Sequence, residues 1–282
     1  MDNPVLKIAD VEFSYEGDSS PTLKNLNIKI FPGERLSIVG PGGSGKSTLL
    51  KIILGLLKPQ KGSVHLLGFD MVHGSEKEKL KILSKVGMAF QQGALFDFMT
   101  VEENLQFSMI QASADKDEMS TRITDLLAKI KLPHTPKMFP HELSGGMQRR
   151  IGIARAVAAQ PDVVLFDEPT SGLDPVTSSI IIKMIQAITD EISASQSSEV
   201  EEKAVAKTAV MASSAIDMAM RFADRMIVLR DNEVIADQSW RKLIIGDDPW
   251  IRHFLSARLI GVDRAYVEKL GVPPEFLAAH FS

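Results

Sequence analysis

One short glycine-rich segment limits the folds open to this chain more than any other feature. It reads Gly40-Pro41-Gly42-Gly43-Ser44-Gly45-Lys46-Ser47, and it lies between the apolar run 36–39 and a stretch, 48–54, whose apolar residues have helical spacing. A buried strand that turns into a helix through such glycines presents inward-pointing backbone N–H groups and a helix N-terminus, both of which attract phosphate oxygens. The pattern predicts an α/β fold with a phosphate-binding loop, in which Lys46 reaches the β- and γ-phosphates and Ser47 ligates Mg²⁺. The alternative is a glycine-rich turn without a ligand.

Composition excludes several classes of protein. The chain has 282 residues, of which 44% are hydrophobic, so it can bury a core in one large or two small domains. A net charge of −4 gives no reason to expect nucleic-acid binding, and no apolar run approaches the roughly 18 residues that span a bilayer. The chain has no cysteine, which rules out disulfides and thiolate metal sites, and its first residues do not resemble a signal peptide. We expect a cytoplasmic protein that meets a membrane only through partners.

The remaining pattern predicts strands on both sides of a helical insertion. Residues 5–13 and 26–30 are expected to form N-terminal strands beside the phosphate-loop strand, and 63–67 and 86–90 are further strand candidates. Thr100 and Glu103 have the spacing of a capping box that opens a helix, and a second helix is expected over 119–130. The stretch 92–160 therefore predicts a helical subdomain inserted in an α/β core.

A second apolar run, 163–166, ends in two acids. Asp167 and Glu168 follow a segment typical of a strand buried on both faces, at the edge where α/β sheets bind ligands. Asp167 is predicted to hold Mg²⁺ and Glu168 to orient or deprotonate an attacking water. Two acids that merely end a strand are the alternative.

The C-terminal third continues the α/β pattern and then becomes helical. A helix is expected from Pro175, a solvated loop over 193–207, a strand over 208–212 and a closing strand pair over 226–229 and 234–236. The domain prediction is a nucleotide-binding α/β core over 1–238 and a helical extension over 239–282, with breaks at Gly246, Pro249, Gly261 and Pro273-Pro274.

The motif Leu143-Ser144-Gly145-Gly146-Met147-Gln148 makes the pattern more specific. With the phosphate loop and the acidic pair in this order, residues 5–236 resemble the ATPase subunit of ATP-binding cassette (ABC) transporters. The resemblance implies an α/β core with N-terminal antiparallel strands, an inserted helical subdomain that carries this motif and a short helical C-terminal extension. The resemblance implies ATP and Mg²⁺ as cofactors, Tyr15 as an adenine-stacking ring, Gln91 as a catalytic and Mg²⁺-contacting glutamine, and Asp174 in a loop at a dimer seam. It also implies a homodimer in which each signature motif closes the other subunit's site. The nucleotide-binding residues so implied are Tyr15, Gly40, Gly42, Gly43, Ser44, Gly45, Lys46, Ser47, Thr48, Ser144, Gly145, Gly146 and Asp174.

One position departs from the family pattern. ABC ATPases usually carry a histidine after the strand that follows the acidic pair, and Ser214 stands there in this chain. Serine can donate a hydrogen bond, but it is shorter than histidine and does not protonate near neutral pH. The hypothesis is slower ATP turnover with ATP binding retained; compensation by the local geometry is the alternative.

The subfamily is inferred from two further stretches. Residues 90–97, Phe-Gln-Gln-Gly-Ala-Leu-Phe-Asp, and residues 248–255 are similar to the ATPases of Mla, or MCE-type, phospholipid transporters. The resemblance implies permease subunits, an MCE-domain protein, in some systems a small regulatory subunit, and a peripheral position on the cytoplasmic face of the inner membrane. Phe96, Phe98 and Met99 are candidate permease contacts, with core packing as the alternative. Tail residues such as Trp250, Phe254, Leu255 and Leu259 are expected either to bind a partner or to cover their own domain.

Two other functions stay open. One is an importer ATPase for another solute, such as an amino acid. The other is a nucleotide-gated module that binds ATP without sustained turnover, which intact Lys46, Asp167 and Glu168 argue against.

Overall fold

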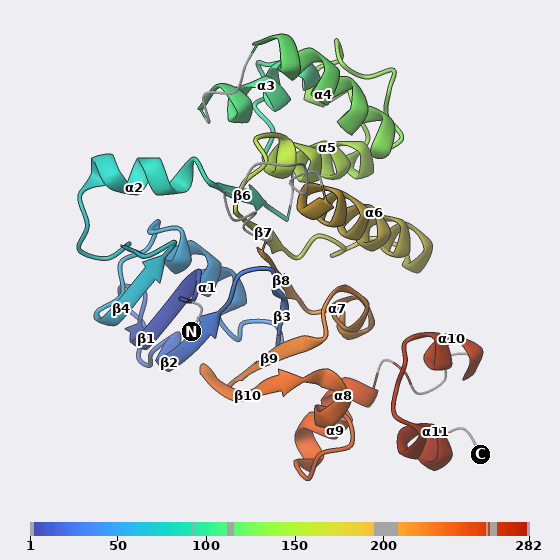
Figure 1. The fold of residues 1–282 in the computed structure, drawn as a ribbon. Coiled ribbons are helices and arrows are strands. Elements are labelled where there is room, and N and C mark those ends of the chain that lie inside the picture. The colour runs from blue at the N-terminus through green and yellow to red at the C-terminus, as the bar shows by residue number, and fades with distance from the viewer. Residues whose placement is uncertain are drawn as a thin grey trace.

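The computed structural model describes residues 3–91, 93–111, 116–194, 208–257, 259 and 264–280. Figure 1 shows helices α3, α4 and α5 above two sheets, with the tail helices α8 to α11 below them. The elements are β1 Leu6–Phe13, β2 Leu23–Ile30, β3 Arg35–Val39, α1 Lys46–Ile53, β4 Lys61–Leu66, β5 Phe69–Asp70, α2 Glu76–Leu83, β6 Val86–Ala89, α3 Val101–Gln111, α4 Lys116–Lys129, the 3₁₀ turn η1 Pro140–Glu142, α5 Gly145–Ala158, β7 Val163–Asp167, α6 Pro175–Ala194, β8 Thr208–Ser213, α7 Ile216–Phe222, β9 Arg225–Arg230, β10 Glu233–Ser239, α8 Trp240–Leu243, α9 Pro249–Ser256, α10 Arg264–Lys269 and α11 Pro274–His280.

The larger sheet has six strands in the order β10-β9-β3-β8-β7-β6. Its neighbouring strands are parallel except for β10, which closes the edge in an antiparallel pair with β9. Every residue of β7 and β8 is buried, as continuous apolar runs predict for strands covered on both faces. The predicted mixed α/β fold is confirmed, and the carboxyl ends of β3, β7 and β8 meet at one edge.

Alternate residues of these central strands enter two different hydrophobic cores. In β7, Val163 and Leu165 pack with helix α1 and the N-terminal sheet, whereas Val164 and Phe166 pack with the helices on the opposite face. This two-sided burial follows from the period of two along a strand, which sends successive side chains to opposite faces. The central sheet is therefore fixed from both sides, and its loop-bearing edge is a rigid platform.

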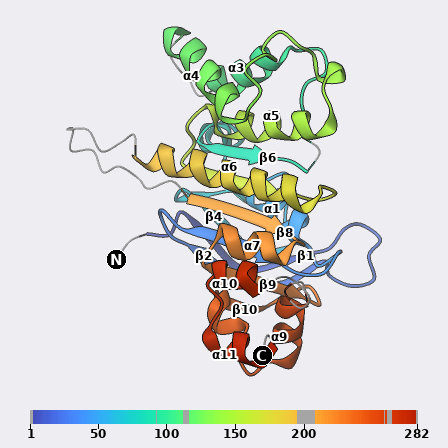
Figure 2. The ribbon, with the colours of Figure 1, turned by 90° about the vertical axis from the view of Figure 1, so that its right-hand side faces the viewer.

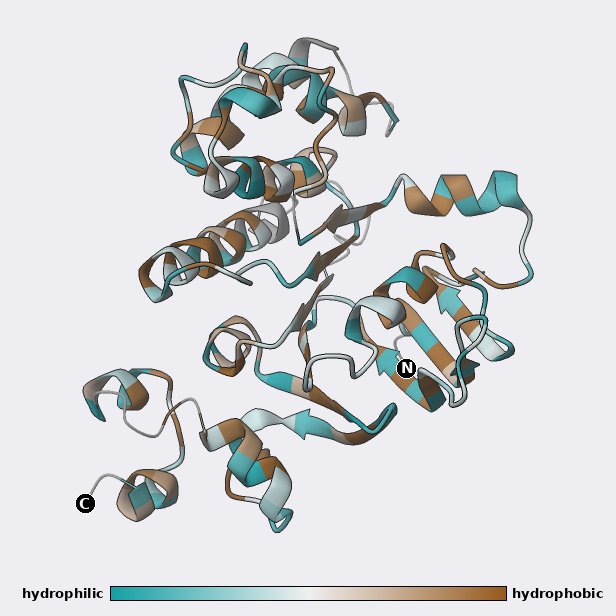
Figure 3. Cartoon of the chain, turned by 180° about the vertical axis from the view of Figure 1, so that it is seen from behind, coloured by the Kyte–Doolittle hydropathy of each residue, from teal (hydrophilic) through white to brown (hydrophobic). Residues whose placement is uncertain are grey.

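The N-terminal strands are antiparallel, as expected, but they form a second sheet, so their predicted place beside the phosphate-loop strand is wrong. They pair antiparallel in the order β2-β1-β4-β5, while the sheet neighbours of β3 are β8 and β9. In Figure 3, β1 and β2 alternate between brown and teal, as expected for strands with one face in the core and one in water. This alternation identifies the buried face of each strand but not the neighbouring strand. Their apolar face packs in the same core as α1.

The stretch between β6 and β7 holds α3, α4, η1 and α5, as the predicted helical insertion requires. The capping box is present, because Thr100 N donates to Glu103 Oε2 at 2.7 Å and Glu103 N donates to Thr100 Oγ1 at 3.3 Å. Fully buried Asn104 ties the chain before α3, donating to the carbonyl oxygens of Phe96, Met99 and Thr100. The segment that leads from the sheet into the helices is thereby held in place.

The aromatic residues before α3 differ from the expectation of an exposed contact surface. Phe98 is 76% exposed, but Phe96 and Met99 are partly buried. The Phe96 ring packs edge-on against Phe107 at 4.8 Å and lies 5.4 Å from the Arg155 guanidinium. Core packing therefore accounts for Phe96, and Phe98 keeps its role as a candidate contact. Gln92, which precedes this stretch, lies outside the described residues.

Two short helices have no counterpart in the sequence-based predictions. Helix α2 begins after Ser75, whose hydroxyl accepts from Glu78 N at 3.4 Å and donates to Glu78 Oε2 at 2.7 Å, so a serine N-cap marks its start. Helix α7 begins two residues after Ser214, and five of its seven residues are buried. It matters for the site because it fixes the chain that carries Ser214.

The tail covers its own chain. Leu255 and Leu259 are fully buried, and the stacked rings of Trp250 and Phe254, 4.9 Å apart, pack against the same core. The Arg230 guanidinium from β9 lies 4.4 Å from the Trp250 ring. These contacts favour the domain-covering alternative for this part of the tail (Figure 2). Of the expected boundaries, Gly261 and positions 195–207 lie outside the described residues. No helix in the described ranges is both long and apolar enough to cross a bilayer.

Candidate functional site

The phosphate loop connects β3 to α1 at the carboxyl edge of the large sheet. Gly45, with φ of +90°, precedes the helix, and a Cβ there would lie 2.4 Å from Leu23 Cδ2. A Cβ on Gly40 would lie 2.3 Å from the Leu229 carbonyl oxygen, so both positions require glycine. At Gly42 and Gly43, by contrast, a Cβ would have no atom within 4 Å. The loop is thus packed at its two ends and open in its middle, where a phosphate would sit.

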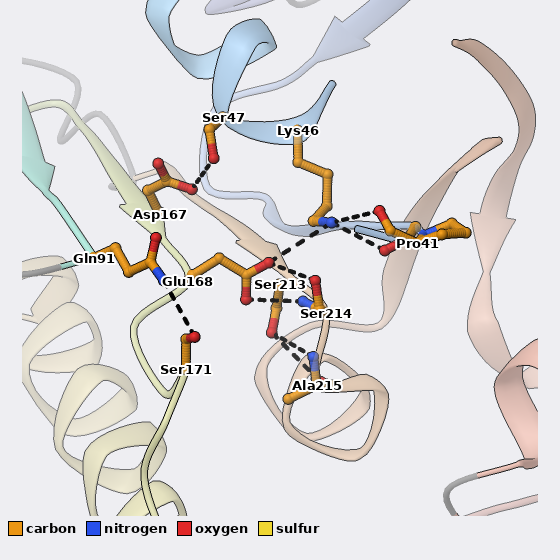
Figure 4. Close-up of polar contacts among 11 residues, drawn as sticks. Pro41, Lys46, Ser47, Gln91, Asp167, Glu168, Ser171, Ser213, Ser214 and Ala215 are labelled. Carbon is orange, nitrogen blue, oxygen red and sulfur yellow. Dashed lines mark hydrogen bonds and ion pairs between the residues drawn. The ribbon is translucent and has the colours of Figure 1, made fainter. Parts of the chain in front are cut away.

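Lys46 is the first residue of α1, and its side chain turns back over the loop (Figure 4). Its Nζ donates to the carbonyl oxygens of Gly40 at 2.9 Å and Pro41 at 3.1 Å, and it lies 3.6 Å from Glu168 Oε1. Burial lowers the pKa of Lys46 and the Glu168 carboxylate opposes that shift. An ammonium held largely away from water in this position is suited to pair with an anion.

Ser47 and Asp167 form the oxygen-rich side of the site. Ser47 Oγ donates to Asp167 Oδ1 at 2.8 Å, and burial raises the pKa of the Asp167 carboxyl although this hydrogen bond opposes the rise. Gln91, just beyond β6, donates from Nε2 to Ser171 Oγ at 3.2 Å, and Figure 4 shows its side chain beside Asp167. A hydroxyl, a carboxylate and an amide oxygen form the donor set that Mg²⁺ favours, so these residues fit the ion.

Glu168 is held by three groups at once. Ser214 Oγ donates to Glu168 Oε1 at 2.6 Å, Ser214 N donates to Oε2 at 2.9 Å, and Lys46 lies near Oε1. The backbone of Glu168 has φ of +46°, in the left-handed region, and its N–H donates to the Ala212 carbonyl oxygen. The serine in the histidine's place thus reaches the acid directly and orients its carboxylate.

Tyr15 lies where β1 ends, at the mouth of the site. Its ring is 40% exposed, packs edge-on against Phe13 at 4.9 Å, and its hydroxyl shares a hydrogen bond with Thr48 Oγ1 at 3.1 Å. An exposed aromatic face fixed from behind in this way is suited to stack on a planar base.

A cavity of about 500 Å³ gathers most of the predicted site residues. It is lined by Tyr15, Thr22, Gly42, Gly43, Ser44, Gly45, Lys46, Ser47, Thr48, Gln91, Glu168, Ser171 and Ser214. Ser44 Oγ is buried and has no hydrogen-bond partner within the described residues, which is the kind of group a bound phosphate would satisfy. The cavity therefore fits a nucleotide phosphate chain.

The signature residues and Asp174 do not line this cavity. Ser144 caps helix α5 by accepting from Met147 N at 3.3 Å, and a Cβ on Gly145 or Gly146 would meet nothing within 4 Å. Asp174 caps helix α6 by accepting from Val176 N and Thr177 N, both at 3.0 Å. Both motifs therefore serve as helix caps within the chain and leave an open glycine surface at the start of α5.

Two residues that the sequence analysis did not assign to the site, Arg149 and Ser171, connect Gln91 to helix α5 and to the loop after Glu168. Arg149, in α5, donates from Nε to the Gln91 carbonyl oxygen at 3.1 Å and from its guanidinium to the Ser171 carbonyl oxygen. Ser171 in turn holds the Gln91 side chain. Arg149 follows the signature motif directly, and this position was the only signal in the sequence.

Comparisons with known proteins show the family of the chain. A family model described as "ABC transporter" matches residues 23–171, which include the phosphate loop, the signature motif and the acidic pair. The chain belongs to the ABC transporter family. Its structure is similar to the ATP-binding cassette MJ0796, solved as a dimer in a post-hydrolysis state with ADP and Pi, with a TM-score of 0.71, 32% identity and coverage of 83% of this chain and 98% of that one.

Relatives in sequence carry several transporter names. The energy-coupling factor transporter ATP-binding protein EcfA of Methanothermobacter thermautotrophicus is 34% identical over 83% of this chain and 70% of its own length. The intermembrane phospholipid transport system ATP-binding protein MlaF of Haemophilus influenzae is 31% identical over 84% of this chain and 85% of its own. The chain spans 64% of the length of a 34% identical Mycobacterium bovis relative, the probable ribonucleotide transport ATP-binding protein mkl. These similar identities place the chain among ABC ATPases without selecting one transporter type.

The serine contact with Glu168 leads to a prediction about turnover in this ABC ATPase. Ser214→Ala removes the hydroxyl that orients Oε1 but keeps the backbone donor, so we expect steady-state ATPase activity to fall about tenfold. Ser214→His is expected to raise the rate above wild type, because imidazole is longer and can take or give a proton near neutral pH. Phosphate release at saturating Mg-ATP measures both, with Ser213→Ala as the neighbouring control. An unchanged rate in Ser214→His would contradict the hypothesis of a serine-limited site.

Proposed function

We propose that the chain is the ATP-hydrolysing subunit of an ABC transporter that moves phospholipids at the inner membrane, working as a homodimer on its cytoplasmic face. The proposed homodimer rests on one observation: the phosphate-binding cavity and the signature motif lie in different parts of the chain. The cavity around Lys46 is lined by the phosphate loop, the acid and the glutamine, whereas the start of α5 lies elsewhere on the chain. There Ser144 and Gly145 are exposed, and a Cβ on Gly145 or Gly146 would meet no atom within 4 Å. A second copy would bring its α5 N-terminus to the triphosphate and complete the site.

Each residue then has a chemical task. The phosphate loop and Lys46 bind the β- and γ-phosphates, and Tyr15 stacks on adenine. Glu168, aligned by Ser214, orients a water for in-line attack on the γ-phosphate and accepts its proton. Bound Mg²⁺, held by Ser47, Asp167 and Gln91, would neutralise charge on the phosphates. Lys46 and the opposing Ser144 stabilise the charge that develops on the transferred group.

The proposed phospholipid substrate has less support than the proposed ATPase activity. Two stretches of the sequence, residues 90–97 and 248–255, resemble Mla-type ATPases, and the relative MlaF carries a phospholipid transport name. The chain matches 85% of that relative's length. The second candidate is an importer ATPase for another solute, which the similarly related EcfA and a methionine-import relative, MetN, favour.

Affinity purification of the tagged chain from native membranes in mild detergent tests this proposal. We expect a permease, an MCE-domain protein and enriched phospholipid to co-purify, because a peripheral ATPase of this type acts only through such partners. A small regulatory subunit is a further expected component. The Lys46→Ala variant, purified in parallel, controls for binding that depends on nucleotide. A different permease without an MCE protein would select the solute importer, and recovery of no membrane protein would select the nucleotide-gated module.

A further inference from the structure

A second large cavity lies between the core and the tail, away from the nucleotide site. It has a volume of about 1100 Å³, and it lies between the start of β3, helices α6 and α7, and the tail helices α8 and α10. Figure 2 shows α6, α7 and α10 one below the other, and residues of all three helices line the cavity. No residue of the phosphate loop or the acidic pair lines this tail cavity, the name used for it below. It is therefore a separate candidate site.

Basic side chains dominate the tail cavity. Six basic residues line it, Arg35, Lys183, Arg221, Arg225, Arg241 and Lys269, against two acids, Glu34 and Asp224. Three of the arginines are paired: Arg225 with Glu34 at 2.7 Å and with Asp237, Arg241 with Asp224, and Arg35 with Asp190. A surplus of positive charge remains.

The surplus comes from Lys183, Lys269 and Arg221. Within the described residues, none of the three has an ion pair with a carboxylate, and both lysines are exposed. Arg221 instead donates to Ser179 Oγ and lies with its guanidinium 4.4 Å from the Tyr266 ring. Three cations around one cavity without carboxylate partners attract an anion that can satisfy them.

The apolar lining and the volume of the tail cavity indicate which kind of anion it can hold. Buried Ile182, Phe222 and Leu270 line it beside the charged groups. A volume of this order exceeds that of a simple inorganic ion and falls near the range of small-molecule sites, which combine apolar walls with a few placed polar groups. We propose that the tail cavity binds a phosphate-bearing organic ligand, with Lys183 and Lys269 as its phosphate contacts.

Tyr266 relates the tail cavity to the catalytic acid. Tyr266 and Ser179 also line a third cavity, of about 550 Å³, whose other walls include Glu168, Ser214 and Thr170. The Tyr266 hydroxyl donates to Asp217 Oδ2 at 3.3 Å, on the helix that follows Ser214. A bound phosphate that attracts Arg221 away from Ser179 and Tyr266 would move two residues that line both cavities. Because the third cavity also contains Glu168 and Ser214, occupancy of the tail cavity changes ATP turnover.

Binding of sn-glycerol 3-phosphate to the full chain tests the site without relying on ATP hydrolysis. In a Lys46→Ala background, which weakens phosphate binding at the loop, titration calorimetry is expected to show binding that Lys183→Gln with Lys269→Gln weakens about tenfold. Lys242→Gln removes an exposed lysine of α8 that does not line the cavity, and it is expected to leave the affinity unchanged. Equal affinity in the double variant and in the Lys242→Gln control would overturn the site.

Two further measurements identify the source of the phosphate and the coupling. Sedimentation with phosphatidylglycerol vesicles that depends on both lysines would assign the group to a lipid headgroup, whereas calorimetric binding alone assigns it to a soluble ligand. At saturating Mg-ATP, sn-glycerol 3-phosphate is expected to change the wild-type ATPase rate at least twofold and to leave the rate of the double variant unchanged. The double variant should keep its basal rate. Binding without a change in the wild-type rate would overturn the coupling through Tyr266.

Discussion

Replacing Glu168 with glutamine is expected to lower ATP turnover by about a hundredfold or more while ATP binding persists. The carboxylate accepts hydrogen bonds from both Ser214 Oγ and Ser214 N, one on each oxygen, and lies beside the Lys46 ammonium. A glutamine of the same shape has one acceptor oxygen and an NH₂ that faces one of these donors, so it loses both the base and its alignment. Phosphate release at saturating Mg-ATP measures the loss.

The same variant reports on the homodimer. If hydrolysis is blocked but binding is not, ATP should remain between two copies, and size-exclusion chromatography with Mg-ATP is expected to show a dimer. Glu233→Gln, an exposed acid on β10 whose nearest ion pair with Lys24 is 4.0 Å long, serves as the matched control and should keep the wild-type rate. A Glu168→Gln protein that stays monomeric with ATP would argue against completion of the site by a second copy.

Replacing Lys46 with alanine is expected to weaken ATP binding about a hundredfold, since charge-assisted contacts to phosphate are worth about 1.5–3 kcal/mol each. Lys46 is 6% exposed, and its ammonium is held against the Gly40 and Pro41 carbonyl oxygens at the open middle of the loop. The variant leaves no cation in that position. Equilibrium binding of a fluorescent ATP analogue measures the change.

Lys58→Ala is the matched control for Lys46→Ala. Lys58 is exposed, follows α1 and does not line the nucleotide cavity, so its loss should leave the affinity within twofold. Thermal unfolding without nucleotide separates a binding defect from a folding defect. Burial lowers the pKa of Lys46, which means that removing the ammonium from water costs more free energy than its contact with Glu168 returns. The charged side chain therefore adds little to folding stability, and we expect the alanine variant to keep its melting temperature. Wild-type affinity in Lys46→Ala would show that the nucleotide lies elsewhere.

Local patterns in the sequence predicted the individual strands and helices better than they predicted which strands pair with one another. The run 163–166 and the glycine segment identified β7 and the β3 to α1 turn, because burial on both faces and a strand-to-helix turn each leave a short-range signature. The sheet to which β1 and β2 belong depended on contacts with residues far along the chain, which periodicity does not encode. Strand period identifies a face and gives no neighbour.

The candidate site divides in the same way. Residue types and spacing indicated Lys46, Asp167 and Glu168, each beside a recognisable turn or strand end. The contact from Ser214 to Glu168 joins residues 46 positions apart, and Arg149 reaches Gln91 across 58. Such pairs arise from the packing of α5 and α7 against the sheet. The local pattern of a single sequence does not encode such long-range contacts.

The left-handed backbone at Glu168 means that a substitution there can change stability and activity in opposite directions. A residue other than glycine, asparagine or aspartate at φ near +46° is held there by its surroundings, typically at about 1 kcal/mol or more. Glycine or asparagine would relieve that strain while removing the acid, so the chain would gain stability as it lost activity. A screen that selects only for thermal stability would therefore be drawn to the residue on which ATP hydrolysis depends.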